Sequence, residues 1–234
     1  MMNVLILVLS ARREPWRALM DTQMETWDKS HPQTITRYYC GKSDDDNMFV
    51  WNSPHLTESL EDVSPRTIEA FEKSLELDNW DYLARPHSST YVHKANLVKF
   101  CETLPTTNVL CGIETGGDRS FIWGGGHFLF SRDVIERMVE NKDKWNRNIM
   151  DDQSITEMAK ELEIPVTPGR TATVNFQPDG SYLTLTYNHG ENFTHTDFEG
   201  IGENLDGHFF VRCKHDPDRT VDLKIMRELH KHWK

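Results

Sequence analysis

Apolar and amphipathic stretches alternate over the first half of the chain. The continuous apolar run at Asn3–Leu9 is typical of a strand buried on both faces, whereas Pro15–Trp27 carries its large apolar residues on one side of a helix. The further predicted elements are a strand at Thr34–Tyr39, a helix with Ser64 as N-cap before Pro65, a strand at Trp80–Ala84, a helix at His93–Thr103 and a strand at Asn108–Ile113. This alternation predicts an α/β sheet layered with helices.

The second half of the chain has a different pattern. Phe121–Phe130 is aromatic and predicts a strand interrupted by three glycines, and Ser131 is a suitable N-cap for a helix behind it. The remaining predicted elements are a helix that opens at Asp151, a half-exposed strand at Tyr182–Tyr187 and a final amphipathic helix with Val221, Ile225 and Leu229 on one face. No repeat, low-complexity segment or linker divides the chain, so we expect one domain over residues 1–234.

The composition is that of a folded, acidic protein. Of the 234 residues, 37% are hydrophobic and 7 are Trp, which is enough for a core and argues against disorder. The net charge of −11 argues against a protein that coats nucleic acid, because that task needs a basic surface. The charge is uneven, however: Gly207–Lys234 carries seven basic and four acidic residues, so this basic segment is +3 while the rest of the chain is −14.

Targeting signals and cysteines point to one kind of environment. The strongest apolar run, Val4–Leu9, is six residues long and is far shorter than the roughly 18 residues of a membrane span. It lacks a preceding basic region, so a signal peptide is not expected. The four cysteines show no CxxC spacing and are too sparse for a disulfide framework. We therefore expect free thiols and a soluble protein of the cytoplasm.

An acidic pair, Asp151-Asp152, stands at the start of a predicted helix. One of these carboxylates is a candidate general base that takes a proton from a hydroxyl nucleophile, and its neighbour would raise its pKa by repulsion. The alternative is that both acids only complement the positive end of the helix dipole. The sequence leaves both interpretations open.

Three glycines, Gly124, Gly125 and Gly126, interrupt the aromatic strand next to Trp123. Glycines inside a strand cost stability, and the usual reasons for them are a bulge or the close approach of a ligand. Trp123 beside such a gap would form an apolar platform for a sugar ring, or it would pack a bend in the sheet. No Walker loop, GxGxxG, GxSxG or Cys/His metal spacing occurs in the chain.

The basic segment contains several candidates for binding phosphate. His208, Arg212, Lys214 and Arg219 surround a predicted strand end and turn before the last helix. A helix N-terminus together with Arg and Lys side chains is well suited to hold phosphate oxygens. An ordinary solvated face is the alternative.

These pieces together resemble fringe-like and beta-1,3-type glycosyltransferases over roughly residues 3–165. The matching stretches are Trp80–Val92, Trp123–Asp133 with its glycines and trailing Ser-Arg-Asp, and Asp151–Ile155 with its acidic pair. A closer likeness is to small soluble glycosyltransferases encoded by large viruses and phages. The resemblance implies a single GT-A-like (Rossmann-like) α/β domain with a central mixed sheet flanked by helices, a nucleotide-sugar donor (commonly a UDP-sugar), and inversion at the anomeric carbon with Asp152 as base.

The chain departs from the family at one functional position. His87-Ser88-Ser89 stands where the family carries the acidic triplet that binds a metal, and one imidazole with two hydroxyls is a poor replacement for carboxylates. Either Arg212, Lys214 or Arg219 neutralises the leaving diphosphate, or Mn²⁺ or Mg²⁺ binds through His87 or His208 with help from Asp81. The charge of the basic segment on an otherwise acidic chain favours the first alternative.

The resemblance divides the chain into a donor half and an acceptor half. Residues 1–110 would bind the nucleotide sugar and residues 111–234 the acceptor, a glycan or glycoprotein hydroxyl. General position makes Ser10, Arg12, Arg66 and Arg85 further donor candidates, because ligands bind at the carboxyl ends of strands in such sheets. Two rival functions stay open: a non-catalytic sugar-binding protein, and a phage-type DNA-base glycosyltransferase that acts on a flipped hydroxymethylated base.

Overall fold

A computed structural model describes most of the chain. The described residues are 2–44, 49–115, 121–124, 127–169, 171–176, 183–187, 192–195, 205, 207–213 and 219–233. The strands are β1 (Val4–Leu9), β2 (Thr34–Cys40), β3 (Val50–Asn52), β4 (Tyr82–Arg85), β5 (Thr90–Val92), β6 (Leu110–Gly112), β7 (Phe128–Ser131), β8 (Val166–Pro168), β9 (Thr171–Phe176), β10 (Leu183–Tyr187), β11 (Asn192–His195) and β12 (Phe210–Arg212). The helices are α1 (Trp16–Glu25), α2 (Val63–Ser74), α3 (Lys94–Cys101), α4 (Arg132–Glu140), α5 (Asp151–Glu161) and α7 (Thr220–His232), with a 3₁₀ turn η2 (Lys142–Lys144).

A seven-stranded mixed sheet forms the centre of the fold. Its strand order is β3-β2-β1-β4-β7-β6-β8, with β1 parallel to both β2 and β4, and β7 antiparallel to β4 and β6. Alternate residues of β1 enter two different cores: Val4, Ile6 and Val8 face one, whereas Leu5 and Leu7 face the other. The apolar run that predicted a doubly buried strand is explained by these two cores.

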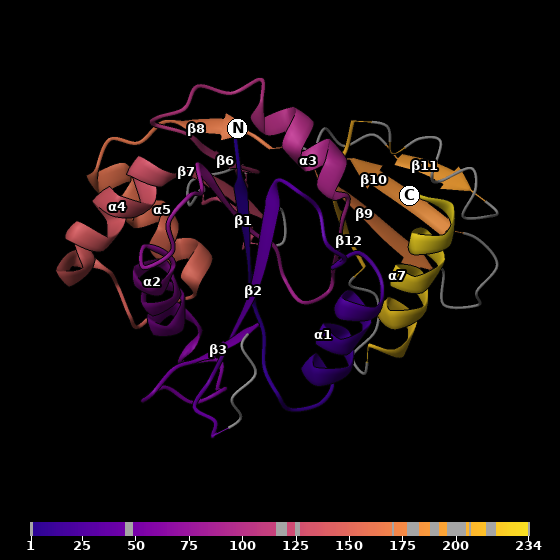
Figure 1. The fold of residues 1–234 in the computed structure, drawn as a ribbon, viewed down its shortest axis with the longest axis horizontal. Helices are drawn as coiled ribbons and strands as arrows, with labels where there is room; N and C mark the ends of the chain where they lie inside the picture. Colours follow the sequence, from indigo (N-terminus) through magenta and orange to yellow (C-terminus); the bar gives the residue numbers. More distant parts are fainter. Residues whose placement is uncertain are drawn as a thin grey trace.

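Helices cover both faces of the central sheet. In Figure 1, α2, α4 and α5 lie on one side of it, and α1, α3 and α7 lie on the other side together with a second sheet. The predicted α/β fold class, with a central mixed sheet flanked by helices, is therefore confirmed.

A second sheet places the basic segment next to residues 87–92. Its order is β11-β10-β9-β12-β5, and the antiparallel pair β12–β5 sets Arg212 opposite Thr90. Cys213 N–H also donates to the carbonyl of Ser89 at 2.8 Å. This pairing, between residues more than a hundred positions apart, carries Arg212 to the His87–Ser89 segment.

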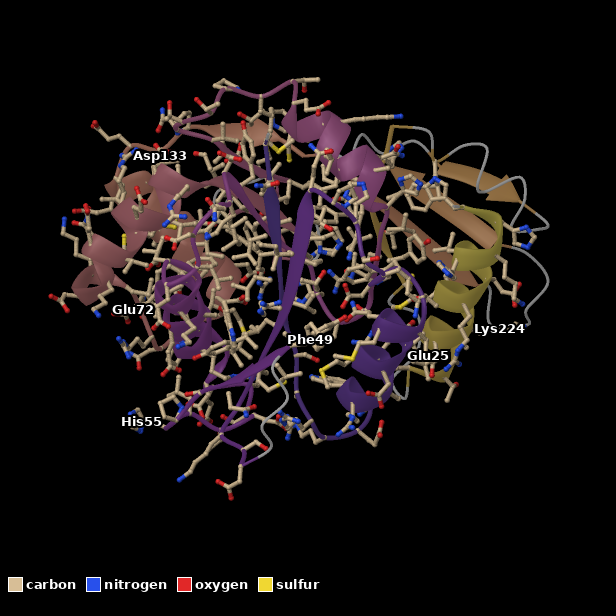
Figure 2. The ribbon with its side chains drawn as sticks, in the orientation of Figure 1. Glu25, Phe49, His55, Glu72, Asp133 and Lys224 are labelled. Carbon is tan, nitrogen blue, oxygen red and sulfur yellow. The ribbon has the colours of Figure 1, made fainter. Side chains whose placement is uncertain are left out.

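The last helix is fixed against the first. Arg227 of α7 lies 3.1 Å from Glu25, which Figure 2 labels between α1 and α7. Tyr91 of β5 donates its hydroxyl proton to the carbonyl of Trp233 at 3.0 Å, just beyond the end of α7. These contacts fix the second half of α7 against α1 and β5.

Several predicted details are wrong. Phe121–Phe130 does not form one strand: Ile122 makes an isolated bridge with Glu114, and β7 begins only at Phe128. Ser64 is not the N-cap of α2, because the helix begins at Val63 and its N-cap is Asp62. The Ser64 hydroxyl donates to the carbonyl of Asn146 instead. The short strands β3, β5 and β8, and the longer β9 and β11, were not predicted from the sequence pattern, whereas β12 lies where a strand end was expected before the last helix.

Two further expectations concern the environment of the chain. All four cysteines are buried and free, as the sequence predicts. Among the described residues, no helix has the length and apolar character needed to cross a membrane.

Candidate active site

A cleft of about 320 Å³ opens at the carboxyl ends of β1 and β4. Its volume is near the lower end of the range for small-molecule sites. It is lined by Leu9, Ser10, Trp16, Leu19, Leu60, Val63, Arg66, Arg85, His87, Ser88, Ser89, Trp123, Gly124, Met150, Asp151, Asp152, Arg212 and Arg219. Most of the residues predicted for the site therefore line one cleft, although they come from six separate parts of the sequence.

The amino-terminal ends of four helices converge on this cleft. Trp16, Val63 and Asp151 are the first residues of α1, α2 and α5, and Arg219 is the N-cap of α7; all four line the cleft. Each helix N-terminus carries a partial positive charge and unpaired N–H groups. The cleft is thus electrostatically suited to an anion before any side-chain charge is considered.

Asp151 forms the floor of the cleft together with Arg85. The two side chains form a buried ion pair, and Arg85 and Asp151 are only 1% and 2% exposed. Thr67 also donates to the Asp151 carboxylate, at 3.2 Å. Because its carboxylate already pairs with Arg85, Asp151 serves as a buried counter-ion.

Asp152, the next residue, lies in a more open position. Its Oδ2 accepts the backbone N–H of Gly124 at 3.1 Å, and its Oδ1 accepts the N–H of Gln153 at 2.9 Å. Burial raises the pKa of Asp152 above its ordinary value, and the adjacent Asp151 carboxylate raises it further. A half-buried carboxylate with a raised pKa, fixed by two N–H donors, has the properties of a general base.

The absence of a side chain at Gly124 leaves room for this carboxylate. A Cβ atom at position 124 would lie 3.0 Å from Oδ2 and 3.1 Å from Cβ of Asp152. The sequence suggested a close approach by a ligand, but the observed approach is that of the Asp152 side chain. Gly125 and Gly126, the other two glycines of the prediction, lie outside the described residues.

Arginine side chains from the basic segment stack on two tryptophans of the cleft. Arg212 lies over the ring of Trp123 at 5.0 Å, and Arg219 lies over Trp16 at 5.5 Å. Arg219 also pairs with the fully buried Asp222 at 2.8 Å. Burial, together with the nearby Arg219 guanidinium, lowers the pKa of Arg212 to about 10, so Arg212 keeps its positive charge at neutral pH.

Arg66 and Ser10 form the part of the cleft nearest to β1. Arg66 is 3% exposed and donates from Nη1 to the carbonyl of Ser10 at 3.0 Å. Within the described part of the chain, the buried Ser10 Oγ, Arg66 Nε, Arg85 Nε and Arg212 Nη1 atoms have no hydrogen-bond partner. Buried polar atoms of this kind are normally satisfied, so four of them around one cleft make it a candidate binding site.

The residues at the family's metal position do not fit a divalent cation. Nη1 of Arg85 lies 3.3 Å from Nε2 of His87, and burial with the charges of Arg85 and Arg212 lowers the pKa of His87 well below its ordinary value. Two guanidinium groups repel a cation, and the hydroxyls of Ser88 and Ser89 do not offset that repulsion. The described residues contain no group of three His, Cys, Asp or Glu side chains that could hold a metal ion.

Three candidates from the sequence do not line the cleft. Asp81 precedes β4 and accepts the backbone N–H of Asn3 at 2.7 Å, so it lies at the opposite end of the strand from Arg85. Arg12 binds the side-chain oxygen of Asn52 at 3.0 Å, and the carbonyl of His208 accepts from Asn96 at 2.8 Å. Lys214 lies outside the described residues. A metal shared between His87, His208 and Asp81 therefore has no support from their positions.

The cleft also contains residues that the sequence analysis missed. Leu60 and Met150 are 66% and 40% exposed and, with the 36% exposed Trp123, are the exposed apolar residues of the cleft, which we call its mouth. Met150 directly precedes the acidic pair, which is a signal that sequence reasoning could have used. Leu60 has no comparable signal, because it lies in a loop whose position depends on α2.

The central mixed sheet, its helical layers and the cleft at the carboxyl ends of β1 and β4 define a mixed α/β fold. A similar solved structure is that of a glycosyltransferase involved in the glycosylation of the major capsid of PBCV-1, with 12% identity over 96% of this chain and 99% of that chain and a TM-score of 0.56. A cytidylyltransferase from Leptospira borgpetersenii (13% identity, 72% and 76% coverage) and TarS from S. aureus (10%, 71% and 58%) reach TM-scores of only 0.46 and 0.45. No family model and no curated protein matches the sequence.

Proposed function

We propose that this chain is an inverting glycosyltransferase that moves a sugar from a nucleotide-sugar donor, a UDP-sugar in the first instance, to a hydroxyl of a glycan or glycoprotein. The observation that carries the proposal is Asp152: a carboxylate with a raised pKa, held by the N–H of Gly124 at 3.1 Å, in a cleft that also holds four arginines. The fold supports it, because the similar PBCV-1 structure is that of a glycosyltransferase.

The proposed reaction is a single displacement. Asp152 takes the proton of the acceptor hydroxyl while the hydroxyl oxygen forms a bond to the anomeric carbon of the donor. The bond between that carbon and the phosphate oxygen breaks, and the nucleoside diphosphate leaves with the electron pair. Attack from the side opposite the leaving group inverts the configuration at the anomeric carbon. Because a raised pKa makes the ionised carboxylate a stronger base, the environment of Asp152 favours this role.

The two halves of the chain would contribute different parts of the site. Residues 1–110 supply Ser10, Arg66 and Arg85 for the donor, whereas the later half supplies Trp123 and Asp152 for the acceptor. Arg212, although it comes from the acceptor half, reaches the donor side through the β12–β5 pairing. The exposed apolar mouth of Leu60, Met150 and Trp123 suits the apolar face of a sugar ring.

Replacement of the proposed base tests the function. Purified protein is incubated with a panel of nucleotide sugars and acceptors, and release of the nucleoside diphosphate and transfer are both measured. We expect Asp152→Asn to lower transfer by about two to four orders of magnitude while nucleotide binding persists. The matched control is Asp143→Asn, because Asp143 is an exposed carboxylate that does not line the cleft.

The same assay distinguishes the rival functions. No release from any common nucleotide sugar, with or without Mn²⁺, would contradict catalysis and favour a sugar-binding protein. Transfer to hydroxymethylated duplex DNA, but to no glycan or glycoprotein, would favour the DNA-base enzyme. Unchanged transfer by Asp152→Asn would remove Asp152 from the mechanism.

A further inference from the structure

Charge pairing separates the four arginines of the cleft into two classes. Arg85 is neutralised by Asp151, and Arg219 is neutralised by Asp222 at 2.8 Å. Within the described residues, Arg66 and Arg212 form no ion pair with any acid, although both line the same cleft. The cleft therefore presents two guanidinium groups that none of its described carboxylates pairs with directly. Asp222 attracts Arg212, and Glu58 and Asp62 attract Arg66, only from a greater distance.

The positions of these two arginines make their lack of a counter-ion costly. Arg66 is 3% exposed, and Nη1 of Arg212 and Nε of Arg66 are buried atoms without a partner in the described part of the chain. An uncompensated charge taken out of water costs several kcal/mol unless an anion is close.

The ligand that meets this demand carries two negative charges close together. The diphosphate of a nucleotide sugar carries two negative charges on adjacent phosphates, whereas a nucleoside monophosphate carries its charge on a single phosphate. Guanidinium groups bind phosphate oxygens through pairs of hydrogen bonds. On leaving, the diphosphate gains one more negative charge, so groups that hold it also stabilise the departure.

We infer that Arg66 and Arg212 together hold the diphosphate of the donor in place of a divalent cation, so that the cleft selects nucleoside diphosphates and works without metal. This inference rests on the proposed function and deepens it. Arg219, which the sequence also offered for this role, is paired with Asp222 and shapes the cleft instead. The misfit of a cation beside His87 has the same origin, because the unpaired Arg212 adds positive charge at that position.

Nucleotide binding in EDTA tests the inference. Dissociation constants of UDP, GDP, UMP and GMP are measured by calorimetry for the parent and for Arg66→Gln and Arg212→Gln, with and without Mn²⁺. The parent is expected to bind one diphosphate at least tenfold more tightly than its monophosphate and to be indifferent to Mn²⁺ within about twofold. Each Gln variant should weaken diphosphate binding about ten- to a hundredfold and bring the ratio of the two affinities toward one.

Two further variants guard against trivial explanations. Arg13→Gln removes the same charge from an exposed residue that does not line the cleft, and it should change binding less than twofold. Arg212→Lys keeps the charge but loses the planar fork, so it should bind with intermediate affinity. Thermal unfolding of each variant shows that the protein is folded at the assay temperature.

The possible outcomes separate this inference from the proposed function. Transfer that requires Mn²⁺, equal affinity for mono- and diphosphates, or Gln variants that bind like the parent would overturn the inference and leave the glycosyltransferase function standing. Failure of the parent to bind any nucleotide would overturn both.

Discussion

Asp151 and Asp152 are neighbours in the first turn of α5, yet they lie in two different regions of the cleft. On the floor, Asp151 is 2% exposed, pairs with Arg85 and accepts from Thr67. At the mouth, Asp152 faces solvent in part and, among the described residues, its carboxylate accepts backbone N–H groups from Gly124 and Gln153 and no side-chain donor. The same type of side chain is a fixed counter-ion in one region and the proposed base in the other.

The arginines show the same division between the two regions. Arg85 on the floor is held by a buried carboxylate, whereas Arg212 lies over the half-exposed ring of Trp123 at 5.0 Å and has no such partner among the described residues. Paired charges fix the shape of the cleft, and unpaired charges are left for a ligand. The charge of a side chain alone therefore does not identify a candidate functional residue in this cleft. The ion-pair partner and the burial of the side chain do.

Loss of the floor carboxylate should have the largest effect on stability. Asp151→Asn keeps the shape of the side chain but leaves Arg85, which is 1% exposed, without a counter-charge. We expect the free energy of unfolding to fall by about 3–5 kcal/mol, measured by urea denaturation. Asp152→Asn, at the mouth, should change it by less than about 1 kcal/mol.

A double variant separates charge from packing on the floor. Arg85→Met combined with Asp151→Leu removes both charges and should recover much of the stability lost in Asp151→Asn. If Asp151→Asn lowered the free energy of unfolding by as little as Asp152→Asn, the carboxylates of floor and mouth would not differ in their contribution to stability.

A methyl group at Gly124 should act on the mouth alone. In Gly124→Ala, the new Cβ would lie 3.0 Å from Oδ2 of Asp152, so the carboxylate must move by a few tenths of an ångström. We expect kcat/KM for transfer to fall about tenfold, since proton transfer depends on position, while stability changes by about 1 kcal/mol or less. Gly169→Ala is the matched control, because its Cβ would meet Gly112 at an ordinary distance of 3.4 Å. Equal kinetics in the two variants would contradict the role given to Gly124.

The sequence was most informative where a periodic pattern extends over a whole element. The doubly apolar β1 and the amphipathic α1, α4 and α5 were predicted within a few residues, because two cores and one-sided helix burial leave clear patterns. Strands β3, β5, β8 and β12 are only three residues long, and they exist because a distant partner offers hydrogen bonds. No local pattern encodes the pairing of Phe210 with Val92.

The candidate site was predictable as a set of residues but not as a network. Asp152, Trp123 and Arg212 were all singled out from the sequence, and they do line one cleft. That Arg85 pairs with Asp151 could not be predicted, because their proximity requires β4 and the start of α5 to meet at the cleft. Asp81 was misjudged for a related reason: strand direction puts it at the end of β4 away from the cleft.

The pH dependence gives the smallest effect and the sharpest test of the mouth. Burial and the Asp151 carboxylate raise the pKa of Asp152 in the folded protein, so in the window above the ordinary Asp pKa of about 3.9 the folded state binds more protons than the unfolded state. The stability that comes from protonated Asp152 is therefore present at low pH and is lost as the pH rises through the pKa of the folded protein. The rate of transfer needs the ionised base, so it rises over the same pH window. Subtracting the unfolding free energies of Asp152→Asn from those of the parent at each pH isolates this contribution, and the acid limb of kcat/KM should lie at the same pH. A stability contribution that grows with pH would mean that Asp152, like Asp151, is held as an anion by a partner, and the distinction between floor and mouth would then fail.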